Sequence, residues 1–317
     1  MSELDIALIK KRSVSGVIVL TSRTFVLQII AFVSTFLLTI FLSPSIFGVF
    51  YVVSAVISFL GYFSDIGLAA ALIQKKSELT EDDLVTTFTI QQVLVAAVVG
   101  LAFLFSPFIA KFYSLEDAGR YLLYSLLFSF FLSSLKTIPS VLLERKLEFQ
   151  KLVLPQILET LGFYLVAVYL SWKGMGISSF TYAVLVRAVV GLVAIYYVSP
   201  WRIRLGFSLK TAKKLMTFGL PFQFNSFLAL LKDDLLTLFL GKILPLAQVG
   251  YIGWAKKWAE VPLRLIMDSI IRVTFPAFAR LQYSKELLRK GIEKTLFGLS
   301  VAIFPMSISL LFFIRPL

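Results

Sequence analysis

Five charged residues recur at four-residue intervals in one apolar stretch of the chain: Lys256, Glu260, Arg264, Asp268 and Arg272. Four residues turn an α-helix by about 400°, so in a helix these side chains cover one side, with alternating sign. An ionised side chain costs about 2.5–3.5 kcal/mol at the centre of a membrane helix. We therefore expect this charged stripe to border water or paired charges.

Two interpretations of the charged stripe remain open. With the adjacent Lys257 it is net positive. It could form a cavity wall whose cations hold a pyrophosphate or an acidic sugar. Alternatively, its charges pair along the helix and allow a polar helix to enter the membrane.

Further ionisable residues lie in other apolar stretches. Arg23 and Asp65, at depths of about 13 and 10 Å in the first two, could meet as an ion pair or as a cytoplasmic gate or headgroup contact. Arg187 has no obvious local partner and is our first candidate for a cation that lines a cavity. Lys136 and Glu159 are interpreted as lying near cytoplasmic helix ends, where we expect both to snorkel.

Adjacent carboxylates at Asp233 and Asp234 follow Lys232 in the seventh apolar stretch. Adjacent side chains point about 100° apart on a helix, so the two cannot share one face. We expect one to pair and the other to titrate or to bind a cation, which predicts a coupling-ion site.

Several kinds of chemistry are excluded by composition. The chain has no Cys and no His, which excludes a thiol nucleophile, a disulfide framework, a His-based zinc site and a His proton shuttle. The formal charge of +13 comes from residues between apolar runs, without the basic face that nucleic-acid binding requires. We expect no metal, no cofactor and no nucleic-acid partner.

Hydrophobic residues make up 58% of the 317 residues and charged residues 15%, against about 25% charged in a soluble domain. A helix needs about 20 apolar residues to cross a bilayer. The sequence therefore predicts an all-α polytopic transmembrane helical bundle with about nine spans, at 14–42, 46–72, 85–110, 119–142, 152–171, 177–198, 215–240, 246–275 and 293–314.

Positive residues gather on one side of these predicted spans. Placing the N-terminus in the cytoplasm leaves 18 of the 31 Lys and Arg residues in cytoplasmic segments and 5 in outer segments. Lys and Arg of short loops stay on the cytoplasmic side. The predicted N-terminus is therefore cytoplasmic.

An internal repeat relates the seventh and eighth predicted spans to the first and second. FLLTIFLSPSIFGVFY at 36–51 aligns with DLLTLFLGKILPLAQVGY at 234–251, and Gly48 corresponds to Gly250, 202 residues later. A repeat of six spans enters the membrane in the same direction twice, which predicts two parallel six-helix repeats. We expect a first lobe with its linker at 1–214 and an incomplete second lobe at 215–317, so the chain is interpreted as a truncated form.

The predicted outer loops are short and almost free of acids. Membrane glycosyltransferases and polymerases that act on the outer face need a sizeable loop with catalytic carboxylates or a basic clamp. We therefore expect that this protein is not an enzyme, and we propose no catalytic residues.

Several short motifs, in this order and spacing, resemble the oligosaccharide and polysaccharide flippases, similar to Wzx-like O-antigen and teichoic-acid exporters of the multidrug/oligosaccharidyl-lipid/polysaccharide exporter superfamily. They are Arg23, LSPSIFGVF at 42–50, Asp65 to Leu68 with the following 69–75, LLERKLEF at 142–149, and the spaced set Asp234, Gly241, Gly250, Tyr251, Ala255, Pro262 and Pro276.

This resemblance implies two six-helix lobes around a cavity that opens alternately to each side of the cytoplasmic membrane. It also implies an undecaprenyl-pyrophosphate-linked glycan as substrate, moved to the outer leaflet, with membrane lipids and polysaccharide assembly proteins as further partners. Two alternatives remain open: a multidrug or cation antiporter of the same superfamily, and a non-transporting membrane fragment or assembly subunit.

Overall fold

The computed structural model describes residues 3–64, 66–75, 77–146, 148–259 and 285–313. Every element in these ranges is a helix, which confirms the all-α class. The chain forms two compact units, Met1–Tyr251 and Ile252–Leu317. In the second unit, the described residues are the helical segment 252–259 and α12 (Lys285–Phe313).

The first unit contains six long helices that match the first six predicted spans, with three short helices between them. The long helices are α1 (Glu3–Phe41), α2 (Pro44–Ser64), α4 (Glu81–Leu104), α6 (Asp117–Ser134), α8 (Phe149–Trp172) and α9 (Ser178–Val198). The short ones are α3 (Leu68–Gln74), α5 (Ser106–Phe112) and α7 (Thr137–Arg145), and the long α10 (Leu209–Ile243) follows.

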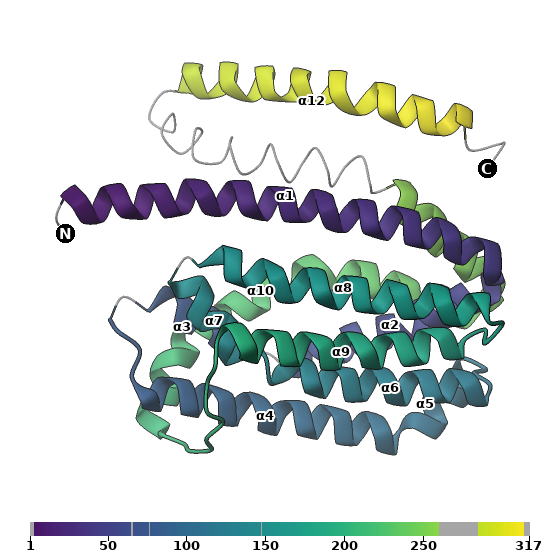
Figure 1. Ribbon diagram of the computed structural model, residues 1–317, viewed down its shortest axis with the longest axis horizontal. Helices are drawn as coiled ribbons and strands as arrows, with labels where there is room; N and C mark the ends of the chain where they lie inside the picture. The colour runs from purple at the N-terminus through teal and green to yellow at the C-terminus, as the bar shows by residue number, and fades with distance from the viewer. Residues whose placement is uncertain (1–2, 65, 76, 147, 260–284, 314–317) are drawn as a thin grey trace. The chain divides into compact units, whose positions relative to one another are not determined.

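The long helices of the first unit pack in a row. Contacts join α1 to α8, α8 to α9, α9 to α6 and α6 to α4, while α2 packs on α6 and α4 (Figure 1). An aromatic cluster holds the middle of this bundle: the rings of Phe50 and Phe180 lie 4.3 Å apart, and Phe163 packs against both. Helix α10 lies against α2, α3 and α4.

Three predicted spans are interrupted rather than continuous. The predicted span 46–72 is split because α2 ends at Ser64 and Gly67 has φ 74°, a left-handed conformation that a continuing helix cannot adopt. The predicted span 119–142 bends by 43° between α6 and α7. The predicted span 85–110 divides into α4 and α5, where a proline stands at the first turn of α5.

Six described helices are long and apolar enough to cross a membrane, and seven if α6 and α7 form one bent span. Helix α10 is not among them, although the sequence predicts a span at 215–240. The predicted span 246–275 lies partly outside the described residues. The chain is thus a multi-span membrane protein, while the nine spans remain a prediction.

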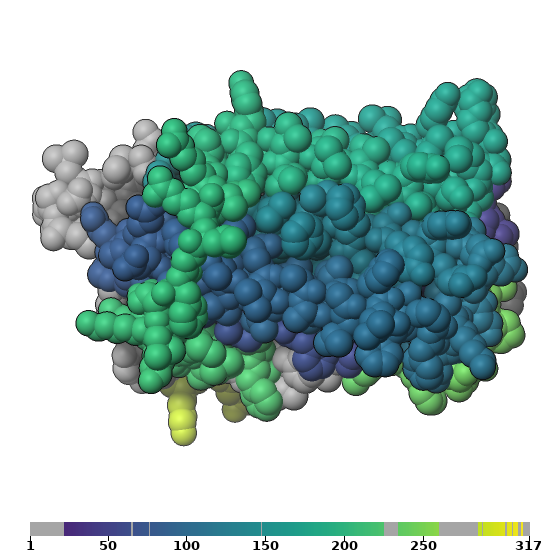
Figure 2. All heavy atoms as spheres, turned by 90° about the horizontal axis from the view of Figure 1, so that it is seen from below, coloured from purple at the N-terminus to yellow at the C-terminus, as the bar shows by residue number. Residues whose placement is uncertain are grey.

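At one end of the first unit, four helices meet in a second apolar core, and the segment after α9 packs beside it. This core joins α3, α4, α7 and α10 around Leu72, Phe88 and Ile138. The segment 199–208 crosses α4, visible in Figure 2 as a green column, and its Gly206 and Ser208 amides donate to threonine hydroxyls of α4. These contacts fix where α10 begins.

The turn at Gly67 makes a close backbone contact with α10. A Cβ atom added to Gly67 would lie 2.1 Å from the carbonyl oxygen of Gly219. Gly174, in the turn between α8 and α9, has a similar φ of 78°, but a Cβ atom there would meet nothing within 4 Å. A substitution at either glycine would therefore strain the backbone, but only at Gly67 would the new side chain also collide with a neighbouring helix.

We predict that Gly67→Ala lowers the apparent melting temperature of the detergent-solubilised protein by several degrees more than Gly174→Ala. Both substitutions strain a left-handed residue, at about 1 kcal/mol, but only the first forces α10 away from the α2–α3 turn. Differential scanning fluorimetry of the two variants measures the difference. Equal shifts would show that α10 does not depend on this contact.

Candidate functional site

Three ionisable residues from successive helices of the first unit come together: Lys136, Glu159 and Arg187. Lys136 stands at the break between α6 and α7, Glu159 in the middle of α8 and Arg187 in the middle of α9. Counted along the helices from the observed ends on the predicted cytoplasmic side, Arg145, Phe149 and Val198, the three residues lie about 14 to 17 Å in, which would be about halfway through a bilayer core of about 30 Å. Helix ends and helix breaks at this depth commonly mark ion or substrate sites in transporters.

These three residues form a charged triad around one carboxylate. Lys136 Nζ lies 2.6 Å from Glu159 Oε1, and Arg187 Nε lies 4.0 Å from Glu159 Oε2. The lysine and glutamate side chains are 17% and 14% exposed, whereas that of Arg187 is 56% exposed. The glutamate is thus hydrogen-bonded to the lysine, and the arginine is held more loosely.

A glycine of α9 makes room for the carboxylate of the triad. A Cβ atom on Gly191 would lie 2.0 Å from Glu159 Oε1 and 2.4 Å from its Cγ atom. The Glu159 side chain therefore lies directly on the backbone of α9, one turn beyond Arg187. Gly162, on the facing side of α8, would place a Cβ atom at an ordinary 3.5 Å from Val186.

Arg187 also lines a pocket between α1, α2, α8 and α9 with a volume of about 310 Å³. Its guanidinium lies 6.0 Å from the centre of the Phe163 ring. The other lining residues combine amide and hydroxyl groups with apolar walls: Leu27, Gln28, Ala31, Phe50, Thr160, Phe163 and Tyr164. One guanidinium beside hydrogen-bonding groups and aromatic rings suits an anion that is attached to a less polar body.

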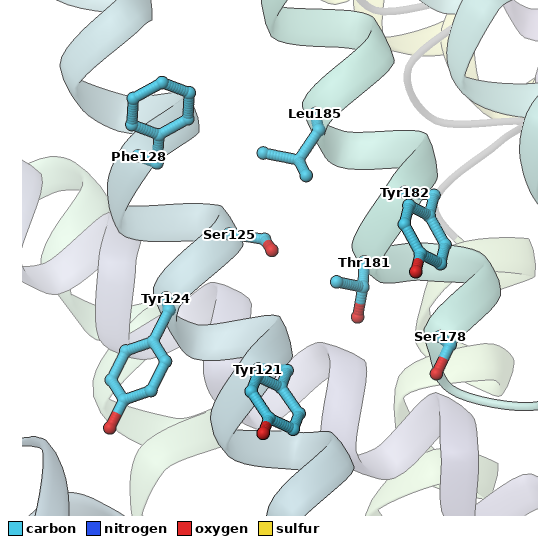
Figure 3. Close-up of a pocket in the computed structure, with 8 residues that line it drawn as sticks. All are labelled: Tyr121, Tyr124, Ser125, Phe128, Ser178, Thr181, Tyr182 and Leu185. Atoms are coloured by element: carbon cyan, nitrogen blue, oxygen red, sulfur yellow. The ribbon is translucent and has the colours of Figure 1, made fainter.

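A second pocket lies between α6 and α9 and has a volume of about 510 Å³. Figure 3 shows Tyr121 and Ser125 of α6 facing Thr181 and Tyr182 of α9. Its lining residues are aromatic, aliphatic or hydroxyl-bearing, and none is charged. This pocket offers hydrogen bonds and ring contacts but no counter-charge for an anion.

Of the two predicted coupling-ion carboxylates, Asp234 has a described partner on another helix. The hydroxyl of Tyr62 on α2 donates to its Oδ2 at 2.7 Å. Asp234 thus accepts a hydrogen bond from a neutral hydroxyl, and this bond links α10 to α2. The Asp233 side chain lies outside the described residues. Within the described part of the chain, no group of three acidic, His or Cys residues could hold a metal ion.

The remaining predicted site residues are only partly described. Arg23 lies half-buried on α1, and Lys256 and Lys257 lie half-buried in the described helical segment 246–259. Asp65, the proposed partner of Arg23, is outside the described residues, as are four members of the charged stripe: Glu260, Arg264, Asp268 and Arg272. Their site roles therefore stay predictions.

Sequence reasoning was wrong about the triad in two respects. Lys136 and Glu159 do not snorkel toward an aqueous end, because each is largely buried and they pair with each other. Arg187, expected to lack a local partner, has Glu159 nearby. The available signal was one or more ionisable residues in each of three consecutive spans, since consecutive antiparallel helices usually pack as neighbours.

We predict that Gly191→Ala displaces Glu159 and lowers the apparent melting temperature, whereas Gly162→Ala has little effect. The new methyl group overlaps a flexible side chain rather than backbone, so the variant still folds while the Lys136–Glu159 pair is broken. Scanning fluorimetry in the wild-type and Glu159→Ala backgrounds measures the coupling. If Gly191→Ala is equally destabilising in both backgrounds, the glycine does not act through Glu159.

The family model for polysaccharide biosynthesis proteins matches residues 37–317 of this chain. The succinoglycan biosynthesis transport protein ExoT of Rhizobium meliloti (strain 1021) is 26% identical over 94% of this chain and 60% of its own length. The lipopolysaccharide biosynthesis protein WzxC of Escherichia coli (strain K12) is 28% identical over 84% of this chain and 54% of its own length.

The teichuronic acid biosynthesis protein TuaB of Bacillus subtilis (strain 168) is 26% identical over 78% of this chain and 51% of its own length. This chain thus spans between half and three-fifths of these curated relatives. No solved structure matches it. Because the family model covers most of the chain, this protein belongs to the polysaccharide biosynthesis protein family.

Proposed function

We propose that this protein moves an anionic lipid-linked oligosaccharide from the cytoplasmic to the outer leaflet of the cytoplasmic membrane. The observation that carries the proposal is the exposed Arg187 guanidinium, at mid-membrane depth in a pocket with hydrogen-bonding and aromatic walls. Family membership supports it, because one relative is named as a succinoglycan transport protein and the others as polysaccharide biosynthesis proteins.

The chemistry of the pocket fits such a substrate in parts. A planar guanidinium binds phosphate oxygens in pairs, which suits a pyrophosphate group. Gln28, Thr160 and Tyr164 supply the groups that hydrogen-bond sugar hydroxyls, and Phe50 and Phe163 supply apolar walls. Transport breaks no covalent bond of the substrate, so these residues bind and orient it and none acts as a catalyst.

In alternating access, the substrate pathway is closed at one side of the membrane while it is open at the other. The first unit contains a close helix contact that could form such a closure. A Cβ atom on Gly48 would lie 1.8 Å from the carbonyl oxygen of Leu246, and one on Gly250 would lie 1.9 Å from that of Pro44. The contact is reciprocal, because Gly48 and Gly250, like Pro44 and Leu246, are 202 residues apart.

Reciprocal contacts between equivalent residues are the signature of a two-fold axis. This reciprocity supports the proposal of two parallel repeats, with a boundary near residue 214, whose second helices cross at the predicted outer side. We infer that the crossing holds the outer end shut while the pocket loads from the cytoplasm. The triad and Asp234 would then lie on the route or beside it, with Asp234 as the candidate for ion coupling.

We predict that Arg187→Gln lowers the initial rate of transbilayer movement about 10- to 100-fold, because a hydrogen bond to a charged group contributes about 1.5–3 kcal/mol. The full reading frame is reconstituted in liposomes with an undecaprenyl-diphosphate-linked oligosaccharide, and outer-leaflet substrate is quantified over time. Arg204→Gln is the matched control, since Arg204 is similarly exposed and also pairs with a glutamate, but at the edge of the bundle.

Two outcomes of the transport assay count against the proposal. Equal rates for Arg187→Gln and Arg204→Gln would remove Arg187 from the substrate route. Absence of flipping by the wild-type protein, together with proton- or sodium-driven export of cationic drugs from the same liposomes, would favour the antiporter alternative.

We predict that Gly48→Ala opens the outer end and slows transport. The new methyl group meets backbone atoms at 1.8 Å, so the crossing helices must separate. The chain has no native cysteine, and Val249 is 2% exposed beside the crossing, so Val249→Cys provides one reporter. We expect faster labelling of this cysteine by an impermeant maleimide in Gly48→Ala.

Gly100→Ala is the control for the outer crossing. Gly100 is also helical, but a Cβ atom there meets nothing within 4 Å, so labelling of the Val249→Cys reporter should stay at its original rate. Equal labelling in Gly48→Ala and Gly100→Ala would mean that the Gly48–Gly250 crossing does not close the outer end.

A further inference from the structure

Lys136 takes no part in lining the pocket of Arg187, yet it forms the shortest contact in the charged triad. The triad holds two cations and one anion, so one positive charge is in excess. How this excess divides between Lys136 and Arg187 depends on which cation neutralises Glu159. The distances answer this, since 2.6 Å is a strong charge-assisted hydrogen bond and 4.0 Å is beyond hydrogen-bonding reach.

We propose that Lys136 is a positioning residue that occupies Glu159 and thereby leaves the charge of Arg187 available to a diphosphate in the pocket. This inference rests on the proposed function and adds a specificity-determining residue that does not touch the substrate. Glu159 is an internal competitor for Arg187, and Lys136 reduces that competition by pairing closely with the carboxylate at Oε1.

The fold provides a structural reason for this division of roles. Lys136 stands at the 43° break between α6 and α7 and reaches Glu159 from there. Gly191 lets the carboxylate lie flat on α9, so that one oxygen meets Lys136 and the other faces Arg187. Arg187 approaches through its Nε edge, while its side chain remains 56% exposed.

Removal of Lys136 alone should therefore neutralise Arg187. A buried carboxylate without its partner is costly in a low-dielectric environment, so Glu159 would bind the guanidinium, which is already nearby. Removal of both Lys136 and Glu159 should free Arg187 again. If only the net charge of the triad mattered, the Arg187→Gln, Glu159→Gln double variant would bind diphosphate as well as the wild type does. That variant also keeps one excess positive charge, on Lys136.

The test uses the full-length protein in lipid nanodiscs and has two independent readouts. The first is the rate at which phenylglyoxal modifies Arg187, measured by peptide mass spectrometry in the absence of substrate. The second is the affinity for undecaprenyl diphosphate relative to undecaprenol, measured by native mass spectrometry. Lys151→Gln is the matched control, because Lys151 also pairs with a glutamate but lies at the exposed start of α8.

We expect Lys136→Gln to slow Arg187 modification and weaken diphosphate binding about tenfold, the order of one charge-assisted hydrogen bond. Lys136→Gln with Glu159→Gln should restore both to within about twofold of wild type, as should Lys136→Arg, which keeps the pairing charge. Arg187→Gln with Glu159→Gln should remain weak in binding, and Lys151→Gln should behave as wild type.

The two readouts separate the possible failures. Unchanged Arg187 modification in Lys136→Gln would overturn the role of Lys136, whatever the binding result. Wild-type affinity in the Arg187→Gln, Glu159→Gln double variant would overturn it as well, by showing that net charge alone matters. Absence of any preference for diphosphate in the wild type would contradict the proposed substrate class, while the modification rates would still decide how the triad shares its charge.

Discussion

The cost of an ionised group inside a bilayer determines how the first unit is organised. Glu159 lies in the middle of the membrane-spanning helix α8, where an unpaired carboxylate would be strongly unfavourable, and Lys136 and Arg187 converge on it. That convergence requires α6, α8 and α9 to lie side by side in a fixed rotation. It also requires Gly191, whose missing side chain provides the space for the carboxylate. A buried ion pair of this kind is weak evidence for stability, but it specifies the packing of three helices.

Close backbone approach is the second constraint. Lipid provides no hydrophobic drive for helices to associate, so small residues that allow intimate contact take a larger role. Gly67 meets Gly219, and Gly48 meets the start of the helix that contains Gly250. Larger residues at these positions would separate α2 from α10 or from the following helix. Both contacts involve α2, whose Tyr62 also donates a hydrogen bond to Asp234 of α10. Helix α2 therefore connects the first six spans to the helices that follow.

Family membership and the chemistry of the candidate site both support the proposed functional class. The relatives bear the names of polysaccharide biosynthesis and transport proteins. The pocket of Arg187 offers one available positive charge among neutral polar and aromatic groups, which matches a charged headgroup joined to sugars. The larger pocket between α6 and α9 lacks any charge and so lacks the feature that would select an anion.

The sequence alone determined the membrane class, the positions of the first six long helices and the family, because apolar length and motif order are local properties of the chain. It also indicated Arg187 and the 202-residue relation between Gly48 and Gly250. The tertiary structure decided what these residues contact. The helix breaks at Gly67 and Lys136 were missed because hydropathy does not register a local backbone conformation. The pairing of Lys136 with Glu159 was missed because distances between side chains of different helices depend on packing and rotation, which no spacing along one helix contains.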